Sequence, residues 1–172
     1  MEQHPTTVQT GIRYGVILGL ISIIISAITF LANIEQNTLS TVISVVITIA
    51  GIYMAHKYFK DQGDGFMTYG QGLGIGTLTS VIAGAMGGIF SYIYLSFIDD
   101  SPLKKAMDQQ RIKFEEQGMS DDQIEAAMNM AEKFSSPIMA LVFSIIFALI
   151  FGFIISLIVS AITKNNNPEE AI

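Results

Sequence analysis

The sequence predicts an all-α integral membrane protein, a four-helix bundle with an extramembrane helical hairpin between its third and fourth spans. Three observations lead to this prediction. Hydrophobic residues make up 51 % of the 172 residues and charged residues only 14 %, below the roughly 25 % of soluble domains. The apolar residues gather in four long runs, each near the ~20 residues with which a helix crosses a bilayer. A charged, amphipathic stretch separates the third run from the fourth.

The chain is interpreted as a single membrane domain covering residues 1–172. Residues 1–11 are polar and are expected to form a loose leader. The first apolar run is longer than the core of a signal peptide, about 7–15 residues, and no good cleavage site follows it, so we expect it to be retained. The second run is rich in Ile, Val and Thr, but its length in a bilayer favours a helix over a strand. The expected spans are about 12–33, 39–59, 69–98 and 137–163, with the hairpin at about 99–136.

Small residues recur at every fourth position of the third run, and similar rows occur in the first and fourth runs. Such rows let helix backbones approach closely, because no large side chain separates them. The predicted helix-packing residues are Gly15, Gly19, Gly72, Gly76, Ser80, Gly84, Gly88, Ser144, Ala148, Gly152 and Ser156. The alternation of Gly70, Gly72, Gly74 and Gly76 is also typical of carbonyl-lined filters and broken transporter helices, which leaves a conducting role as the alternative.

The stretch between the third and fourth runs has the signals of two short helices. Ser101 is predicted to be the N-cap of the first helix, with Pro102 at its first position, and Gly118 suits its left-handed end. Ser120 with Gln123 forms a capping box for the second helix. Two narrow apolar faces are expected to hold these helices together. Methionine suits adaptable contact surfaces, so a possible partner surface is predicted at Met107, Phe114, Met119, Met128 and Met130.

Composition excludes several classes of function. The net charge of −6 disfavours nucleic acid, which attracts basic surfaces. The chain has no cysteine and only His4 and His56 as histidines, so it contains neither a thiolate centre nor a multi-histidine metal site. His56, next to Lys57, is interpreted as an interfacial residue. Asp99-Asp100 and Asp121-Asp122 could bind a divalent cation, but their positions suit helix N-termini better.

No pattern of a catalytic site is present in the predicted spans. Their apolar cores contain no Asp, Glu, Lys, Arg or His, whereas proton-coupled transport and intramembrane hydrolysis need such groups. Isolated serines in these cores are more typical of bonds between helices. We therefore expect no enzyme, no catalytic residue, no cofactor and no metal site.

The distribution of positive charge predicts the orientation. Arg13 precedes the first span, Lys57 and Lys60 follow the second, and Lys164 follows the fourth, which places both termini in the cytoplasm. The hairpin weakens the count because it carries five basic residues of its own. Tyrosines at positions 14, 58 and 69 at one interface, and 92 and 94 toward the other, agree with the same orientation.

Two stretches carry a resemblance to a known family. These are the lead-in Gly63–Gly70 and the Met- and acid-rich segment Glu115–Glu125, which runs through Ser136-Pro137 into the last span. Together with the four spans, from about Thr10 to Lys164, they resemble the bacterial membrane family catalogued as domain of unknown function 4199. The resemblance implies a bacterial inner-membrane protein. It brings no established activity and no functional residues.

Two functions remain open on the sequence. The first is a structural or partner-binding membrane protein, whose hairpin contacts a membrane or periplasmic protein. The second is a small channel or carrier for a small solute, which would act as a homo-oligomer because four helices enclose little space. Membrane lipid is a partner in either case. Hydroxyl and glycine rows that converge on a cavity would favour the second function, and rows that pack dry would favour the first.

Overall fold

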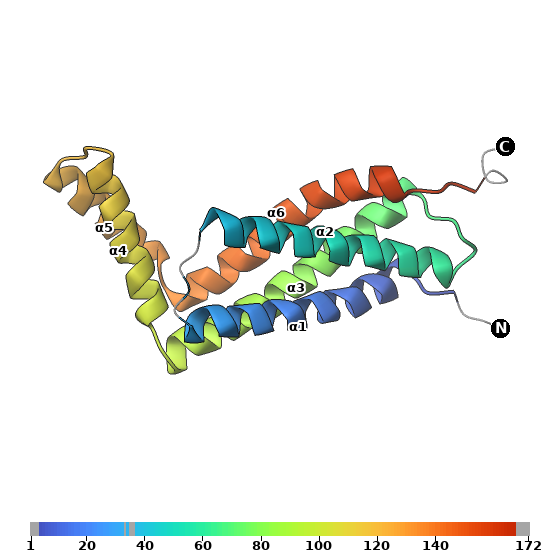
Figure 1. Ribbon diagram of the computed structural model, residues 1–172, viewed down its shortest axis with the longest axis horizontal. Coiled ribbons are helices and arrows are strands. Elements are labelled where there is room, and N and C mark those ends of the chain that lie inside the picture. The colour runs from blue at the N-terminus through green and yellow to red at the C-terminus, as the bar shows by residue number, and fades with distance from the viewer. Residues whose placement is uncertain (1–3, 33, 35–36, 168–172) are drawn as a thin grey trace.

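The computed structural model describes residues 4–32, 34 and 37–167, and over these residues the chain is helical with one isolated β-bridge (Figure 1). The expected turn after the first span, Asn33–Thr38, lies largely outside the described residues, as do residues 168–172 of the tail. The helices of the described chain are α1 Thr7–Leu31, α2 Thr38–Asp61, α3 Tyr69–Phe97, α4 Ser101–Glu116, α5 Asp121–Phe134 and α6 Pro137–Thr163.

Four of the helices, α1, α2, α3 and α6, are long and apolar enough to cross a membrane, with 25, 24, 29 and 27 residues. Many of their large apolar side chains point outward, among them Ile24, Val46 and Phe147. In water such surface would be unfavourable by about 25 cal/mol for each Å². In hydrocarbon it costs nothing, while the helix satisfies its own backbone polar groups.

The first helix begins earlier than the sequence analysis expected. Residues 7–11 were assigned to a loose leader, but they form the first turns of α1. The Thr6 side chain accepts a hydrogen bond from the Gln9 backbone N–H at 3.1 Å, and the Gln9 side chain accepts one from the Thr6 N–H at 3.0 Å. This capping box stabilises a helix start in a polar segment, where hydropathy alone gives no signal.

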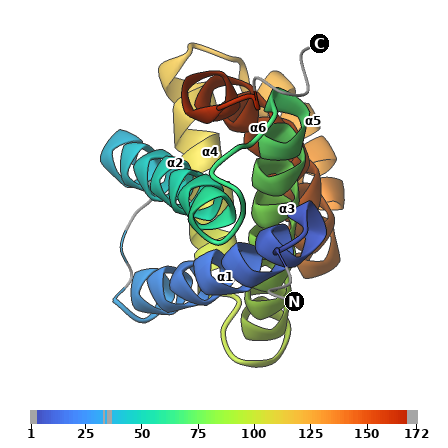
Figure 2. The ribbon, with the colours of Figure 1, turned by 90° about the vertical axis from the view of Figure 1, so that its right-hand side faces the viewer.

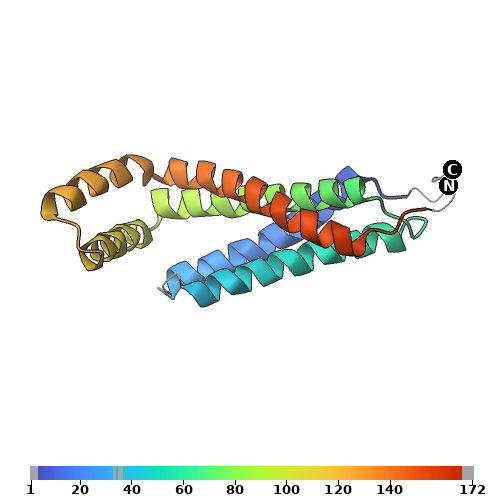
Figure 3. The same cartoon turned by 90° about the horizontal axis from the view of Figure 1, so that it is seen from above.

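Helix α3 lies at the centre of the long helices, between α1 and α6 (Figure 2). Helix α2 packs more loosely, since its buried residues are Ile52, Ala55 and His56, all in its second half. Its first half diverges from α6 toward the end of the molecule that bears α4 and α5 (Figure 3). Helix α2 is therefore packed against α3 and α6 in its second half, while its first half runs beside α1 (Figure 3).

Helices α4 and α5 lie beyond one end of the long helices and are set at a steep angle to them (Figure 1). Gly118 turns the chain between them with φ +75°, a left-handed conformation that glycine adopts without strain. The Ser120 N–H then donates to the Gln123 side chain at 3.0 Å. At the base, the Ser135 hydroxyl donates to the Met107 sulfur at 3.0 Å, which ties the end of α5 to α4.

Candidate functional site

His56, near the end of α2, is the most deeply buried titratable side chain among the described residues, with an exposed fraction of 0 %. Its Nε2 lies 2.8 Å from the Gly72 carbonyl oxygen of α3, and its Nδ1 lies 2.8 Å from the Thr163 hydroxyl of α6. One imidazole thus joins three helices. The interpretation of His56 as an interfacial residue was wrong, because its ring points inward to polar groups that lie far away in the sequence.

The chemistry of the two partners assigns the hydrogens of this ring. A carbonyl oxygen can only accept, so Nε2 carries the hydrogen that bonds Gly72. In the neutral ring Nδ1 then accepts, and the Thr163 hydroxyl supplies the donor. The same hydroxyl lies 2.8 Å from the Val159 carbonyl, so it can rotate away and still be bonded. The network is complete without water.

Further hydrogen bonds tie the end of α6 to the loop between α2 and α3. Lys60 Nζ donates to the Thr163 carbonyl at 3.0 Å, where the C-terminal carbonyls of a helix favour a cation. Met67 and Asn165 exchange two backbone hydrogen bonds of 2.8 and 2.9 Å, and the Asn165 side chain donates to Gly65. The polar composition of the tail predicts a solvated segment from Lys164 onward, but Asn165 is part of this tie.

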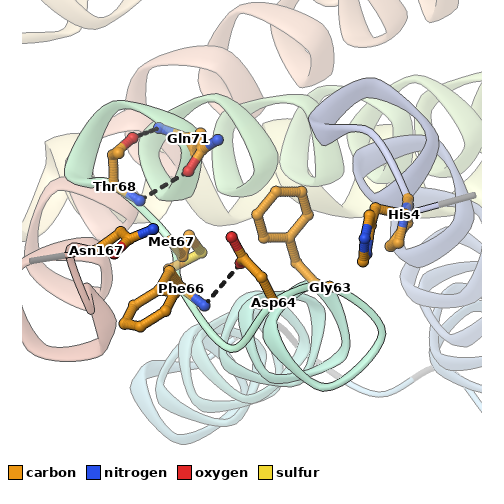
Figure 4. Close-up of a pocket in the computed structure, with 10 residues that line it drawn as sticks. His4, Gly63, Asp64, Phe66, Met67, Thr68, Gln71 and Asn167 are labelled. Carbon is orange, nitrogen blue, oxygen red and sulfur yellow. Dashed lines mark hydrogen bonds between the residues drawn. The ribbon is translucent and has the colours of Figure 1, made fainter. Parts of the chain in front are cut away.

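A small cleft of about 220 Å³ lies beside this loop (Figure 4). Its polar side chains serve the loop itself. Asp64 accepts from the Phe66 N–H at 3.0 Å, while Thr68 and Gln71 form the capping box that begins α3. These bonds account for the side chains of Asp64, Thr68 and Gln71 without a ligand.

The predicted packing residues of α3 and α6 lie opposite one another. A Cβ atom added at Gly72, Gly76, Gly84 or Gly88 would collide with Ser160, Ser156, Ala148 or Ser144 respectively, and one added at Gly152 would collide with Ser80. The two helices are antiparallel and keep one register over five such pairs. Close approach of this kind is what small residues permit in a membrane helix pair. One edge of these rows also lines a cavity described below, with Ser80, Gly84 and Gly88 of α3 and Ser144, Ala148 and Gly152 of α6.

The glycines of α1 pack against large side chains of α3. A Cβ at Gly15 would lie 2.7 Å from Ile82 Cβ, and one at Gly19 would lie 2.5 Å from the Met86 sulfur. From the first contact to the second, the residue number rises by four in both helices, so α1 and α3 are parallel. Gly70 and Gly74, the alternating glycines, have no neighbour within 4 Å of an added Cβ and face away from the other helices. They do not line a filter within one copy of the described chain.

A larger cavity, which we call the lateral cleft, lies where α2 diverges. Its volume is about 740 Å³ and its lining comes from α1, α2, α3 and α6. Small residues of α3, Ala83 to Ser91, form part of this lining, and so do Phe147 and Phe151 of α6. A second cavity of about 270 Å³, the hydroxyl arm, shares seven of its lining residues with the lateral cleft. They are Leu18, Ser22, Ser26, Phe30, Ser44, Thr48 and Ser91.

The hydroxyl arm brings together six hydroxyl side chains from three helices. They are Ser22, Ser26, Thr29, Ser44, Thr48 and Ser91. No ionisable residue lines either cavity. From the sequence, Ser44 and Thr48 are interpreted as part of a small-residue face of the second helix, and no site is predicted at any of the six, although the spacing of Ser22, Ser26 and Thr29 on one face of α1 was visible. What it could not supply is the gap between α1 and α2 into which they point.

The five residues of the predicted partner surface do not form one exposed patch. Met107, Phe114, Met119 and Met128 are half-buried, and only Met130 is largely exposed, at 65 %. Within the hairpin helices, Met130 of α5 and Ile112 of α4 are exposed large apolar side chains. The sequence analysis named Met130 but not Ile112. Phe134 is also exposed but lies at the base, close to α6.

The acidic pair before α4 has local partners. Hydrogen bonds from the Ser101 hydroxyl and its backbone N–H hold the pKa of Asp99 below its ordinary value, and the N–H lies 2.9 Å from Asp99 Oδ1. Asp100 pairs with Lys104 at 2.8 Å, and this bond raises the pKa of Lys104. Both carboxylates thus serve the start of α4, whose N-cap residue is Asp100 and not Ser101 as the sequence predicted.

Comparison with known proteins identifies the family. Residues 13–165 match the family described as "Protein of unknown function (DUF4199)". The chain belongs to this family. The resemblance drawn from the lead-in and the hairpin is thereby confirmed as to family. No curated protein and no solved structure gives a significant match.

Proposed function

We propose that this DUF4199 protein is a non-enzymatic, multi-pass protein of the bacterial inner membrane. In this proposal α1, α2, α3 and α6 span the bilayer as a bundle, α4 and α5 form a hairpin outside it, and both termini are cytoplasmic. The exposed apolar faces of the long helices support the embedding. Support for the orientation comes from Arg13, which stacks 4.5 Å from the Tyr58 ring at the end that also bears Lys60.

The proposed role is to bind a membrane or periplasmic protein through the hairpin. The observation that carries this role is the placement of the hairpin, which projects beyond the long helices and touches them only at its base (Figure 1). Met130 and Ile112 are 65 % and 51 % exposed on otherwise charged helices. At the base, exposed Phe97 and Ile98 of the α3 end are explained by contact with the bilayer surface. Met130 and Ile112 have no such explanation.

The test is crosslinking of the full chain in its own membrane. The double variant Met130→Ser with Ile112→Ser is expected to lose a specific crosslinked product that the parent forms. Ala126→Ser, an exposed change on the same helix α5, is the matched control and should retain it. Products of equal intensity in parent and double variant would exclude these side chains as the partner surface.

Transport of a small solute is the second candidate, and the hydroxyl arm is the observation that favours it. The glycine rows of α3 pack against α1 and α6, which leaves no path between these helix pairs in a single copy of the described chain, although Gly84 and Gly88 also line the lateral cleft. A path through the lateral cleft does have support, since hydroxyl groups line it. Flux of a neutral solute into reconstituted vesicles, above that of empty vesicles and abolished by Gly87→Leu in the cleft, would establish this candidate. Flux equal to empty vesicles would exclude it.

A further inference from the structure

We propose that the lateral cleft and its hydroxyl arm bind an uncharged amphiphile, an alkyl chain that ends in a hydroxyl or amide group. The molecule enters sideways from the bilayer between α2 and α6. This inference rests on the proposed membrane embedding, but it requires neither partner binding by the hairpin nor transport.

The size and surface of the lateral cleft suit an alkyl chain. Its volume of about 740 Å³ falls in the range of about 300–1,000 Å³ that small-molecule sites occupy. Carbon surface dominates its lining, with Ala83, Val45 and Phe151 among the contributors.

The hydroxyl arm supplies the polar end of the site. Four of its six hydroxyls already donate to carbonyls of their own helices, at 2.8–2.9 Å. Each of these oxygens can still accept one hydrogen bond, so together they favour a ligand that donates. Within the described chain, the hydroxyls of Ser26 and Ser91 make no hydrogen bond at all. These two are free to donate or accept.

The absence of charge in the lining selects against ionised head groups. Neither cavity is lined by a Lys, Arg, His, Asp or Glu side chain. A carboxylate or ammonium placed there would lose its hydration without gaining a counter-charge, which costs far more than hydroxyl bonds return. An alcohol or amide loses little free energy on entering the cleft, because the hydroxyl arm replaces its hydrogen bonds to water.

The packing of α2 explains how such a molecule would enter. Ile52 and His56 hold the second half of α2 against α3 and α6, whereas residues 39–47 contain no buried side chain. The opening of the lateral cleft thus lies between the first half of α2 and the rings of Phe147 and Phe151 on α6, which are both 55 % exposed. Rotation of these rings or outward movement of α2 can open the cleft to lipid.

The experiment uses the purified full chain in phosphatidylcholine vesicles and three photoactivatable probes. These are hexadecanol, palmitic acid and hexadecane, each with the same diazirine on its chain. The hexadecanol probe is expected to label residues 22–30 of α1 and 41–48 of α2, as mapped by mass spectrometry. Excess unlabelled hexadecanol should remove this labelling, while excess hexadecane should not. Loss of one hydrogen bond weakens binding about five- to tenfold, which sets the expected excess of hexadecanol over hexadecane labelling.

Variants decide whether the cleft itself is the site. Ser26→Ala with Ser91→Ala should bring hexadecanol labelling down to the hexadecane level, and Ser96→Ala, an exposed serine of α3, should not change it. Gly87→Leu should block labelling by filling the cleft, since an added Cβ there meets only Ser22 at 3.7 Å. Gly74→Leu, which faces open space, is its control, and unchanged melting in detergent shows that each variant folds.

Three results would overturn the proposal. Equal labelling of the cleft by hexadecanol and hexadecane would mean that bilayer lipid fills it without selection. Stronger labelling by palmitic acid at neutral pH would contradict the exclusion of charge. Labelling that survives Gly87→Leu in a folded protein would place the bound molecule elsewhere.

Discussion

At the scale of single residues, His56 has the clearest expected effect. Replacing it with Leu leaves the Gly72 carbonyl and the Thr163 hydroxyl without their imidazole partner, in a place that water does not reach. The Thr163 hydroxyl keeps its bond to the Val159 carbonyl, so the expected loss is that of the two bonds between helices, about 0.5–1.5 kcal/mol for each. We expect His56→Leu to lower the melting temperature in detergent and to raise hydrogen exchange at the end of α6.

The matched variant for this prediction is Thr163→Val, which removes one hydroxyl and keeps the shape of the side chain. Because His56 retains its bond to Gly72, the loss should be smaller, near the ~0.6 kcal/mol average of hydrogen bonds between membrane helices. If His56→Leu has the same melting temperature as the parent, the hydrogen-bond network contributes nothing to stability, and His56 is buried by packing alone.

The role of His56 could not be derived from its neighbours in the sequence. It follows an apolar run and precedes Lys57, which is typical of an interface. The partners that bury it come from the start of α3 and the end of α6, 16 and 107 residues away along the chain. The available signal was its spacing, since His56 continues the face of Ile52 by one turn of the helix.

At the scale of helices, the contact between α3 and α6 determines whether the bundle forms. Gly84 lies against Ala148 and the Ser144 carbonyl, so a leucine there must push two backbones apart. Overpacking of this kind costs about 1–3 kcal/mol or more. We expect Gly84→Leu to lower the yield of folded protein and its melting temperature in detergent.

Two controls separate this contact from a general intolerance of α3. Ile89→Leu changes an exposed side chain of nearly the same volume and should be mild. Gly74→Leu introduces the same leucine at a glycine with open space around it. Should Gly84→Leu resist heat as well as Gly74→Leu does, the small residues of α3 would not be a packing surface.

The sequence predicted where the long helices lie in the chain better than it predicted which helices pack against each other. Length and hydropathy mark four runs, and the rows of small residues predict close packing without saying which helices meet. The pattern does not say that α1 meets the Leu78, Ile82 and Met86 side of α3, because large residues carry no such periodic mark. It also gives no sign of the lateral cleft. A cavity depends on where α2 fails to pack, and no residue pattern records a missing contact.

At the scale of the whole molecule, the proposed membrane embedding requires that one end of the long helices face the cytoplasm. The start of α1, the loop between α2 and α3 and the end of α6 lie together at one end, and the hairpin lies at the other (Figures 1 and 3). Any orientation therefore places these three segments on one side. Arg13, Lys57, Lys60 and Lys164 belong to this end, which favours the cytoplasm for it.

Single cysteines test the orientation directly, because the natural chain has none. Cysteines at Gln117, on the exposed tip of the hairpin, and at Gln62, exposed after α2, report on opposite ends. An impermeant maleimide added to intact spheroplasts should label Gln117→Cys and spare Gln62→Cys. Labelling of Gln62→Cys should appear once the membrane is opened. The reverse labelling pattern would mean that the orientation is inverted and that the hairpin lies in the cytoplasm. Because both cysteines face water in either orientation, this result would leave the four spans and the lateral cleft unchanged.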